Sequence, residues 1–321
     1  MLNAVLIGLG NVAWRFGQDI NSESSLNHKD ALLKNNQVSL LAGYSPDYIQ
    51  VNEFSKSTGI MGYTNLKKML KEIKPDIVSI CSPKEFHAEH IEICLDLNIP
   101  MIWLEKPATS SLEQLNSLQK RINLMPTPPT ILVNFQRRYS ECYQKMKYLI
   151  EQHQYGKPLL IEINYSLGLE VNGSHMIDIL TYLFPNFNYE LLWVEKDIKS
   201  ENPDFIFRLS DRLLVHFSAI ESNFHNLDIR IVFEKARLSI EHGGMSLRIE
   251  EVKENKLFAG FYCLYDEQTS ELGKPGFNFS FDLALNDLIS SNKKLSQPES
   301  NLSTAYFGQL LIEKVFKEIN L

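Results

Sequence analysis

Cysteine is scarce in this 321-residue sequence, and its cysteines are widely separated. They are Cys81, Cys94, Cys142 and Cys263. No two of them are spaced as a zinc-ligand pair or as part of a disulfide framework, so reduced thiols in a cytoplasmic protein are expected. His87 and His90 lie close together, but no neighbouring residue completes a recognisable metal set, so no metal is expected.

Long apolar runs and an excess of positive charge are also missing. The longest uncharged run, Ile122 to Gln136, contains three prolines and is too short and too broken to span a bilayer. Met1 to Ile7 has no cationic lead of the kind that opens a signal peptide. Lysine and arginine total 32 against 39 acidic residues, and the net charge of -7 argues against a broad nucleic-acid surface. We expect neither a membrane nor a nucleic-acid partner.

A glycine-rich turn follows a short apolar run near the start of the chain. The run Asn3 to Ile7 is typical of a strand, and Gly8-Leu-Gly-Asn-Val-Ala13 matches the G-x-G-x-x-G/A pattern of a dinucleotide-binding turn. Gly8 permits the tight turn, and Gly10 lets the backbone approach a pyrophosphate at the start of a helix. The predicted cofactor contacts in this turn are Gly8, Gly10, Asn11 and Val12.

Strands and helices then alternate up to about residue 135. Further strands are expected at Val38 to Ala42, Asp76 to Cys81, Ile99 to Leu104 and Thr130 to Asn134. This alternation predicts a doubly wound parallel sheet, a dinucleotide-binding Rossmann domain over residues 1–135. After the strand that ends at Cys81, the predicted cofactor contacts are Ser82, Pro83 and His87.

The residue after the second strand bears on the choice of cofactor. Dinucleotide folds often place an acid there for the adenosine ribose, but Ser45 occupies that position. A serine does not repel a 2′-phosphate, so NAD and NADP are both admissible, and Asp47 is interpreted as a cap of the next helix. His28 either faces the site or lies on the surface, and the surface is the preferred interpretation.

An acid, a base and a proline end the apolar run of Ile99 to Leu104. Proline disfavours helix at the residue before it, so Lys106 is expected to be extended at the end of the strand. Ligands bind beyond the carboxyl ends of such strands, which makes Lys106 the candidate catalytic residue. Neighbouring strand residues point to opposite faces, so Glu105 and Lys106 cannot both enter one cleft. The alternative is a charged cap of the strand.

The pattern changes beyond residue 136. Seven segments between Pro158 and Tyr265 alternate with period two, and helices are expected at residues 140–152, 173–184, 281–290 and 303–319. These segments predict an α+β domain over residues 136–321 with a largely antiparallel open sheet. Such a sheet is often covered by a second copy, so a homo-oligomer, dimer or tetramer, is expected.

Five motifs together resemble the Gfo/Idh/MocA oxidoreductases, the group of glucose-fructose oxidoreductase and inositol dehydrogenase. They are Gly8-Leu-Gly-Asn-Val-Ala13, Cys81-Ser-Pro-Lys-Glu-Phe-His87, Glu105-Lys-Pro107, Asn134-Phe-Gln-Arg-Arg-Tyr139 and Gly173-Ser-His-Met-Ile-Asp178. The resemblance implies an NAD(P)-dependent oxidoreductase with a small carbohydrate substrate. It places Lys106 by the nicotinamide and the substrate hydroxyl and gives His175 a part in proton transfer. The predicted cofactor contacts at this strand end are Glu105 and Lys106.

Alcohol oxidation needs a hydride acceptor and a group that takes the hydroxyl proton, and a nicotinamide cofactor supplies only the first. A lysine whose pKa is lowered by desolvation can help with the second. His175 begins a predicted helix, where the helix dipole favours neutral imidazole, and Asp178 could orient its ring. The alternative is a capped helix with a buried polar pair.

The resemblance breaks at Val171, where many family members carry an aspartate four residues before the histidine. Valine neither accepts nor holds a proton, so the usual Lys-Asp-His set is incomplete. The string Gly168-Leu-Glu-Val-Asn-Gly-Ser-His175 resembles a branch of the family linked to surface-sugar biosynthesis. The candidate substrate contacts are Arg138, Tyr139, Tyr165, Asn172 and His175.

Two hypotheses of different classes follow. The leading one is hydride transfer to or from a sugar, nucleotide-sugar or cyclitol carbon, with Lys106 and His175 handling the proton. The other is a catalytically silent NAD(P)-binding paralogue that acts as a sensor or partner subunit, and Val171 motivates it. A nucleic-acid-binding regulator is disfavoured, because the sequence has no helix-turn-helix signal and no basic face.

Overall fold

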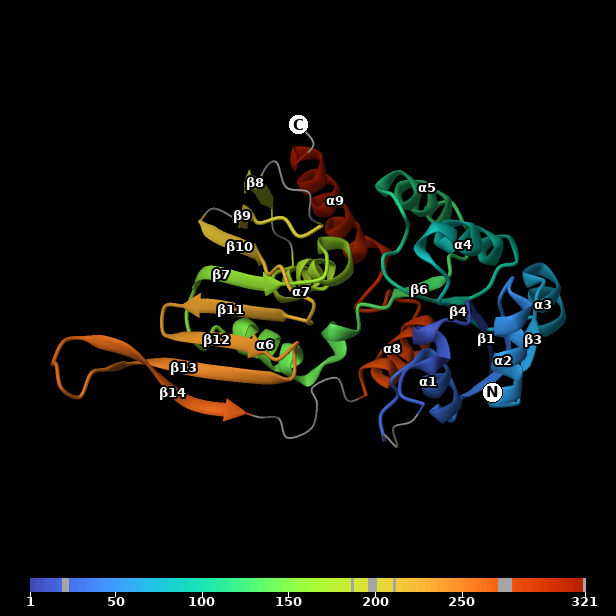
Figure 1. Cartoon of the computed structure of the whole chain (residues 1–321), viewed down its shortest axis with the longest axis horizontal. Coiled ribbons are helices and arrows are strands. Elements are labelled where there is room, and N and C mark those ends of the chain that lie inside the picture. The colour runs from blue at the N-terminus through green and yellow to red at the C-terminus, as the bar shows by residue number, and fades with distance from the viewer. Residues whose placement is uncertain (19–22, 186–187, 196–200, 210–211, 271–278, 320–321) are drawn as a thin grey trace. The chain divides into compact units, whose positions relative to one another are not determined.

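The chain divides into two compact units in a computed structural model that describes residues 1–18, 23–185, 188–195, 201–209, 212–270 and 279–319 (Figure 1). Unit 1 comprises residues 1–136 and 279–306, and unit 2 comprises residues 137–278 and 307–321. The first border agrees with the expected boundary. The return of residues 279–306 to unit 1 corrects the expectation that everything after residue 136 forms the second domain.

Unit 1 is built on a six-stranded sheet in the order β3-β2-β1-β4-β5-β6, with every neighbouring pair parallel. The strands are β1 (Leu2–Ile7), β2 (Val38–Tyr44), β3 (Met61–Tyr63), β4 (Ile77–Ile80), β5 (Met101–Leu104) and β6 (Thr130–Val133). Every residue of β4, β5 and β6 is buried, which is why these strands stand out as continuous apolar runs. The predicted doubly wound parallel sheet is confirmed, with its switch point between β1 and β4.

Helices connect these strands. They are α1 (His28–Lys34), α2 (Tyr48–Thr58), α3 (Leu66–Ile73), α4 (His87–Asp96), α5 (Leu112–Asn123) and α8 (Ser280–Lys294), with short turns at η1 (Asn11–Arg15) and η2 (Lys84–Phe86). Side chains cap several of them: Asn27 accepts the backbone N–H of Asp30 at α1, and Asp47 accepts that of Ile49 at α2. The interpretation of Asp47 as a helix cap is confirmed.

Helix α8 packs on unit 1 although it follows unit 2 in the sequence. The ring of Phe281 lies 5.3 Å from that of His28 and 6.1 Å from that of Trp103. Asp282 accepts hydrogen bonds from the backbone N–H and the hydroxyl of Ser25 at 3.0 and 2.7 Å. The bonds between Ser25 and Asp282 join residues that lie 257 positions apart, and periodicity carries no signal for such a pairing.

Unit 2 contains an eight-stranded sheet in the order β14-β13-β12-β11-β7-β10-β9-β8. Its strands are β7 (Pro158–Tyr165), β8 (Tyr189–Val194), β9 (Phe205–Leu209), β10 (Leu213–Ala219), β11 (Leu227–Phe233), β12 (Ala236–Glu241), β13 (Ser246–Glu254) and β14 (Tyr262–Ser270). Only the β7–β10 pair is parallel among these pairings, so the predicted, largely antiparallel sheet is confirmed. Strand β8 was not predicted.

One face of this sheet is covered and the other is open. The core lies between the strands and the helices α6 (Glu141–Glu151), α7 (Ser174–Leu183) and the later turns of α9 (Leu302–Ile319). Short helical turns η3 (Gln136–Tyr139) and η4 (Leu169–Gly173) precede α6 and α7. In the described part of the chain, no helix is long and apolar enough to cross a membrane. Over the same residues, no group of three or more His, Cys, Asp or Glu side chains is arranged to hold a metal ion.

Candidate functional site

The glycine turn after β1 lies against the end of β4. Gly8 has a φ of +89°, and a Cβ atom added to it would lie 2.5 Å from the backbone nitrogen of Ser82. At Gly10, by contrast, an added Cβ would meet no heavy atom within 4 Å. One glycine therefore permits close packing of two strand ends, and the other leaves open space next to the backbone. This arrangement fits the phosphates of a dinucleotide.

Replacing Gly8 by alanine should destabilise unit 1 by more than about 2 kcal/mol, because the Cβ would meet backbone atoms and the φ is unfavourable for alanine. Dinucleotide affinity should fall with it. The matched control is Gly59→Ala, since Gly59 also has a positive φ, +74°, but open space around its Cβ position. Denaturant unfolding and cofactor titration measure both effects. Equal losses in the two variants would show that close packing on Ser82 does not matter.

Ser45 lies at the end of β2 and is 3% exposed. Its hydroxyl donates to Oε1 of Gln50 at 3.0 Å and accepts the backbone N–H of Asp47 at 3.2 Å. No carboxylate replaces it at the strand end, because the Asp47 side chain is engaged as a helix cap. The local chemistry therefore contains no acid aimed at excluding a 2′-phosphate.

His87 joins the segments that follow β4 and β5. Its Nε2 lies 2.8 Å from the carbonyl oxygen of Ser82, and its Nδ1 lies 2.8 Å from that of Pro107. The side chain is 1% exposed, so these two backbone contacts account for both ring nitrogens. The Lys106–Pro107 peptide is cis. His87 positions two strand ends, and direct contact between its ring and a cofactor stays a prediction.

The hydroxyl of Ser82 lies 2.9 Å from Nδ1 of His90. Burial, and after it the nearby His87, lowers the pKa of His90 to about 4. His90 is therefore neutral at pH 7, where it can serve as a hydrogen-bond partner without placing a buried charge beneath the site.

Glu105 turns inward from the end of β5 into a buried polar network. Its Oε1 lies 2.8 Å from Nε2 of His28 and accepts from the side-chain amide of Asn134 at 2.5 Å. Nδ1 of His28 lies 2.8 Å from the hydroxyl of Ser79. The Asn134 side chain in turn accepts the indole N–H of Trp103 at 3.1 Å. These contacts fix the Glu105 carboxylate in one position.

His28 is completely buried, so the preferred interpretation of it as a surface histidine is wrong. It is the first residue of α1, and its ring lies 4.0 Å from that of Trp103. Burial alone would raise the pKa of Glu105, but hydrogen bonds and charge from His28, the Asn134 amide and the charge of Lys106 outweigh it, and the pKa is lowered. Glu105 is thus an anion at neutral pH.

Lys106 is half-buried at the end of β5. Its backbone N–H donates to Oε2 of Glu105 at 3.3 Å. Glu105 is held inside the unit, with 13% of its side chain exposed. The inward turn of Glu105 agrees with the expectation that Glu105 and Lys106 do not both enter one cleft. The catalytic role of Lys106 stays a prediction.

In unit 2, His175 is the second residue of α7 and is 9% exposed. The expectation that Asp178 orients its ring is not supported, because Asp178 forms a buried bidentate ion pair with Arg138. Nε and an Nη of the guanidinium donate to the two carboxylate oxygens at 2.7 and 2.6 Å. Both side chains are 2% exposed, so Arg138 is a buried structural cation rather than an accessible substrate contact. Lys106 and His175 belong to different units, and their joint action stays a prediction.

Tyr165 is wrongly predicted as a substrate contact. It is completely buried, its ring lies 6.0 Å from that of Phe217, and its hydroxyl donates to the carbonyl of Pro203 at 2.6 Å. Tyr139 is 5% exposed, which leaves little of it for a ligand. Val171 is 53% exposed at the turn before α7, where it replaces the expected aspartate.

Asn172 stays a candidate substrate contact. Its side chain contacts His225, which the sequence did not predict as a site residue. Its amide donates to the carbonyl of Ser166 at 2.8 Å and lies 3.1 Å from Nδ1 of His225. The other ring nitrogen of His225 lies 3.4 Å from the guanidinium of Arg137. Burial and then the charge of Arg137 lower the pKa of His225. His225 comes from the loop before β11, and no motif marks it.

Residues 2–124 match the profile of a family described as oxidoreductases with an NAD-binding Rossmann fold, Gfo/Idh/MocA. The match covers less than half of the 321 residues and shows a likeness of this part of the chain to that family. Inositol 2-dehydrogenase from Mycolicibacterium gilvum is 28% identical over 120 residues, and Inositol 2-dehydrogenase 2 from Mycolicibacterium vanbaalenii is 27% identical over the same length. The chain spans about a third of these curated relatives, 34% of each, and the matched part is 34% of this chain.

Solved structures extend the likeness in fold to both units. Myo-inositol 2-dehydrogenase from Lactobacillus plantarum has a TM-score of 0.75 at 17% identity, covering 99% of this chain and 97% of that one. A 3-ketoreductase from Actinomadura kijaniata in complex with NADP has a TM-score of 0.76 at 13% identity, covering 98% and 97%. At these identities the likeness shows the fold alone: a Rossmann unit and a unit with a largely antiparallel open sheet.

Proposed function

We propose that the chain is an NAD(P)-dependent dehydrogenase or reductase that acts on a CH–OH group of a sugar, nucleotide-sugar or cyclitol. The observation that carries the proposal is the meeting of three features at adjacent strand ends. The glycine turn follows β1, Ser82 follows β4, and Glu105-Lys106 follows β5. In parallel sheets, ligands bind at such carboxyl ends. The inositol dehydrogenases among the similar proteins favour a polyhydroxylated substrate.

The residues that would hold the cofactor all belong to unit 1. The open backbone at Gly10 suits the pyrophosphate, with Asn11 and Val12 beside it, and Ser45 suits the adenosine ribose. The end of β4, with Ser82 and Pro83, and the end of β5 suit the nicotinamide half. When bound, the cofactor supplies the hydride acceptor or donor. NAD and NADP are both compatible with Ser45.

The chain's own residues would handle the proton. Lys106 can take the hydroxyl proton during oxidation or return it during reduction, because a half-buried amine can exchange a proton at its Nζ. His175 is the proposed second proton-transfer group, held at the start of α7. Asn172 is the proposed hydrogen-bond partner of a substrate hydroxyl.

The second candidate is a catalytically silent NAD(P)-binding paralogue. The half-exposed Val171 favours it, since this position carries no proton-transfer group. The two candidates predict different behaviour of the purified protein. Mass spectrometry of small molecules retained through purification should find NAD or NADP, and isotope-labelled cofactor should exchange hydride with at least one member of a panel of sugars, cyclitols and nucleotide-sugars. Retained cofactor with no exchange on the whole panel would favour the silent paralogue.

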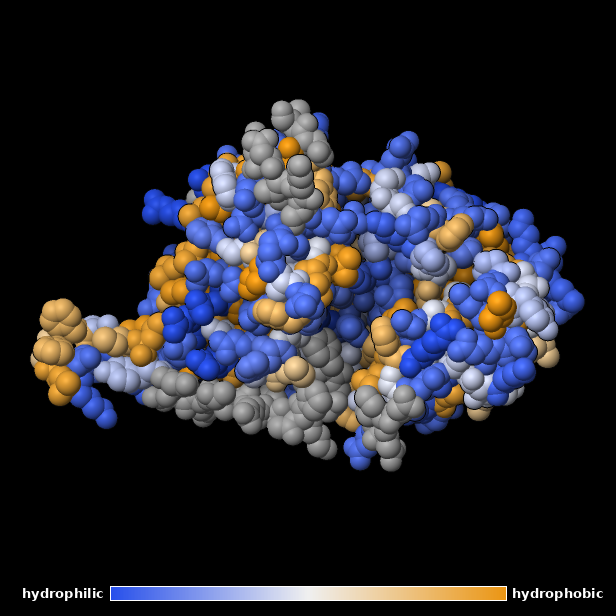
Figure 2. Space-filling view, viewed as in Figure 1, coloured by the Kyte–Doolittle hydropathy of each residue, from blue (hydrophilic) through white to orange (hydrophobic). Residues whose placement is uncertain are grey.

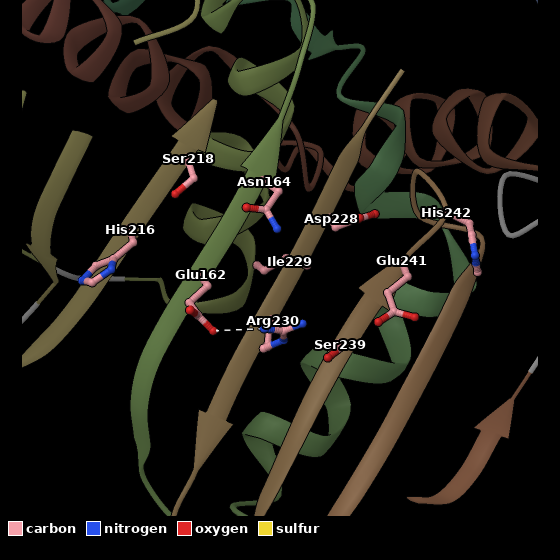
Figure 3. A pocket seen from close by; sticks show the side chains of 10 residues that line it. All are labelled: Glu162, Asn164, His216, Ser218, Asp228, Ile229, Arg230, Ser239, Glu241 and His242. Carbon is pink, nitrogen blue, oxygen red and sulfur yellow. Dashed lines mark ion pairs between the residues drawn. The ribbon is translucent and has the colours of Figure 1, made fainter. Parts of the chain in front are cut away.

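We also propose that a second copy covers the open face of the unit 2 sheet. Glu162, His216, Asp228 and Glu241 line a polar pocket there, and Arg230 pairs with Glu162 at 3.5 Å (Figure 3). The hairpin formed by β13 and β14 carries hydrophobic side chains at its end (Figure 2). The exposed residues are Leu257 at 84%, Phe258 at 62% and Phe261 at 69%. Exposed apolar groups of this size commonly mark a protein interface.

Light scattering should therefore give a mass of two or four chains at micromolar concentration. The double substitution Phe258→Ser/Phe261→Ser should lower that mass, because it removes apolar area from the hairpin end. Leu124→Ser is the matched control, since Leu124 is 85% exposed in unit 1 and its loss should leave the mass unchanged. A wild-type mass of one chain would contradict the proposal.

A further inference from the structure

A buried line of hydrogen bonds runs from the middle of β4 to the end of β5. It joins the Ser79 hydroxyl to Nδ1 of His28, and Nε2 of His28 to the Glu105 carboxylate, each at 2.8 Å. The order serine, histidine, carboxylate is that of a hydrolase triad. Ser79 and His28 are both completely buried, however, so no substrate can reach the hydroxyl. The hydrogen bonds therefore serve to hold the carboxylate of Glu105, which lies at the end of β5.

Glu105 is built to remain charged. One carboxylate oxygen, Oε1, has both His28 and Asn134 as partners, and the other accepts the backbone N–H of Lys106. Hydrogen bonds that favour the ionised form outweigh the cost of burial, and the pKa of the carboxyl is lowered. Burial, and after it the same negative charge, raises the pKa of the nearby Cys81 thiol, which stays neutral. A fixed anion thus sits at the end of β5.

The topology sets which half of a dinucleotide this anion faces. The glycine turn after β1 suits the pyrophosphate, and Ser45 after β2 suits the adenosine ribose, so the nicotinamide half belongs on the β4 and β5 side of the switch point. The oxidised nicotinamide ring carries a positive charge and the reduced ring is neutral. A fixed negative charge in a poorly solvated setting therefore interacts more favourably with the oxidised form.

We propose that the Glu105 carboxylate, held in place by His28 and Asn134, biases the bound cofactor toward its oxidised form. The inference rests on the proposed function, because it needs a nicotinamide cofactor in unit 1. Within it, Glu105 tunes the cofactor, and His28 and Asn134 are positioning residues that act through Glu105. His28 and Lys106 both contribute charge of opposite sign beside Glu105, and that charge acts in the opposite direction. Removing the charge of Glu105 alone would leave the bound nicotinamide in surroundings of net positive charge.

The test compares the dissociation constants of NAD⁺ and NADH, and of NADP⁺ and NADPH, for the full chain at pH 7 by calorimetry. Glu105→Gln removes the charge and keeps the shape of the side chain. It should raise the ratio of the oxidised to the reduced dissociation constant by about tenfold. His28→Gln, which keeps the carboxylate but loosens it, should shift the ratio less. Ser79→Ala, at the far end of the line, should leave the ratio unchanged.

Two further variants keep the outcome decisive. Glu113→Gln removes an exposed charge on α5 and should not move the ratio. The double variant His28→Gln/Glu105→Gln replaces the buried pair by two neutral amides, and it should show the same tenfold shift if the single variant does not fold. Equal weakening of both cofactor forms would overturn the inference and leave Glu105 a purely structural residue. Failure of the wild type to bind either form would instead refute the proposed function, and the inference with it.

Discussion

Replacing Asp178 by asparagine should lower the free energy of unfolding of unit 2 by about 3–5 kcal/mol. Asp178 and Arg138 are each 2% exposed, and the guanidinium donates to both carboxylate oxygens. A buried ion pair is not in itself a large source of stability, because desolvation offsets the attraction. Removing one partner is costly, because the amide cannot neutralise the guanidinium charge that stays inside the unit. Denaturant unfolding followed by circular dichroism measures the loss.

An exposed ion pair in the sheet of the same unit provides the matched control. Glu190 and Arg208 lie across β8 and β9 with side chains 64% and 39% exposed, so Glu190→Gln should cost less than about 1 kcal/mol. The double substitution Arg138→Met/Asp178→Leu, which removes both charges, should recover most of the stability lost in Asp178→Asn. Similar losses in Asp178→Asn and Glu190→Gln would contradict the assignment of Arg138–Asp178 as a buried, fully desolvated pair.

The fold of unit 1 could be predicted because each local signal points to the same answer. Strands β4, β5 and β6 are buried on both faces and therefore consist of continuous apolar residues. The glycine pattern fixes the first turn, and Asp47 marks the start of α2 by capping it. Helix α8 escaped prediction as part of this unit, since its place depends on packing against residues that precede it by a whole unit.

The site was only partly predictable, for reasons that differ from residue to residue. The pairing of His28 with Glu105 spans 77 positions, and the sequence has no periodic signal for it. The sequence likewise has no periodic signal for the pairing of Arg138 with Asp178. Tyr165, however, could have been placed correctly: it shares the parity of Ile161 and Ile163 on β7, and period two puts all three on the core face.

Replacing Lys106 by alanine should lower turnover by about 10²–10⁴-fold on whichever panel substrate the wild type uses, because the loss of a positioned proton-transfer group has that size. Cofactor affinity should change much less, since the glycine turn and Ser45 lie at other strand ends. Lys120→Ala, an exposed substitution on α5, should leave turnover unchanged. Initial rates and cofactor titrations on the same preparations separate the two effects.

Lys106→Arg distinguishes a proton-transfer role from a purely electrostatic one. Arginine keeps the positive charge but does not give up its proton in proteins, so an arginine at this position should be nearly as inactive as alanine if the amine exchanges a proton. Recovery of turnover by arginine would mean that only the charge beside Glu105 matters. Full turnover in Lys106→Ala would remove Lys106 from the mechanism and leave His175 and the neutral His225 of unit 2 as the remaining proton acceptors to test.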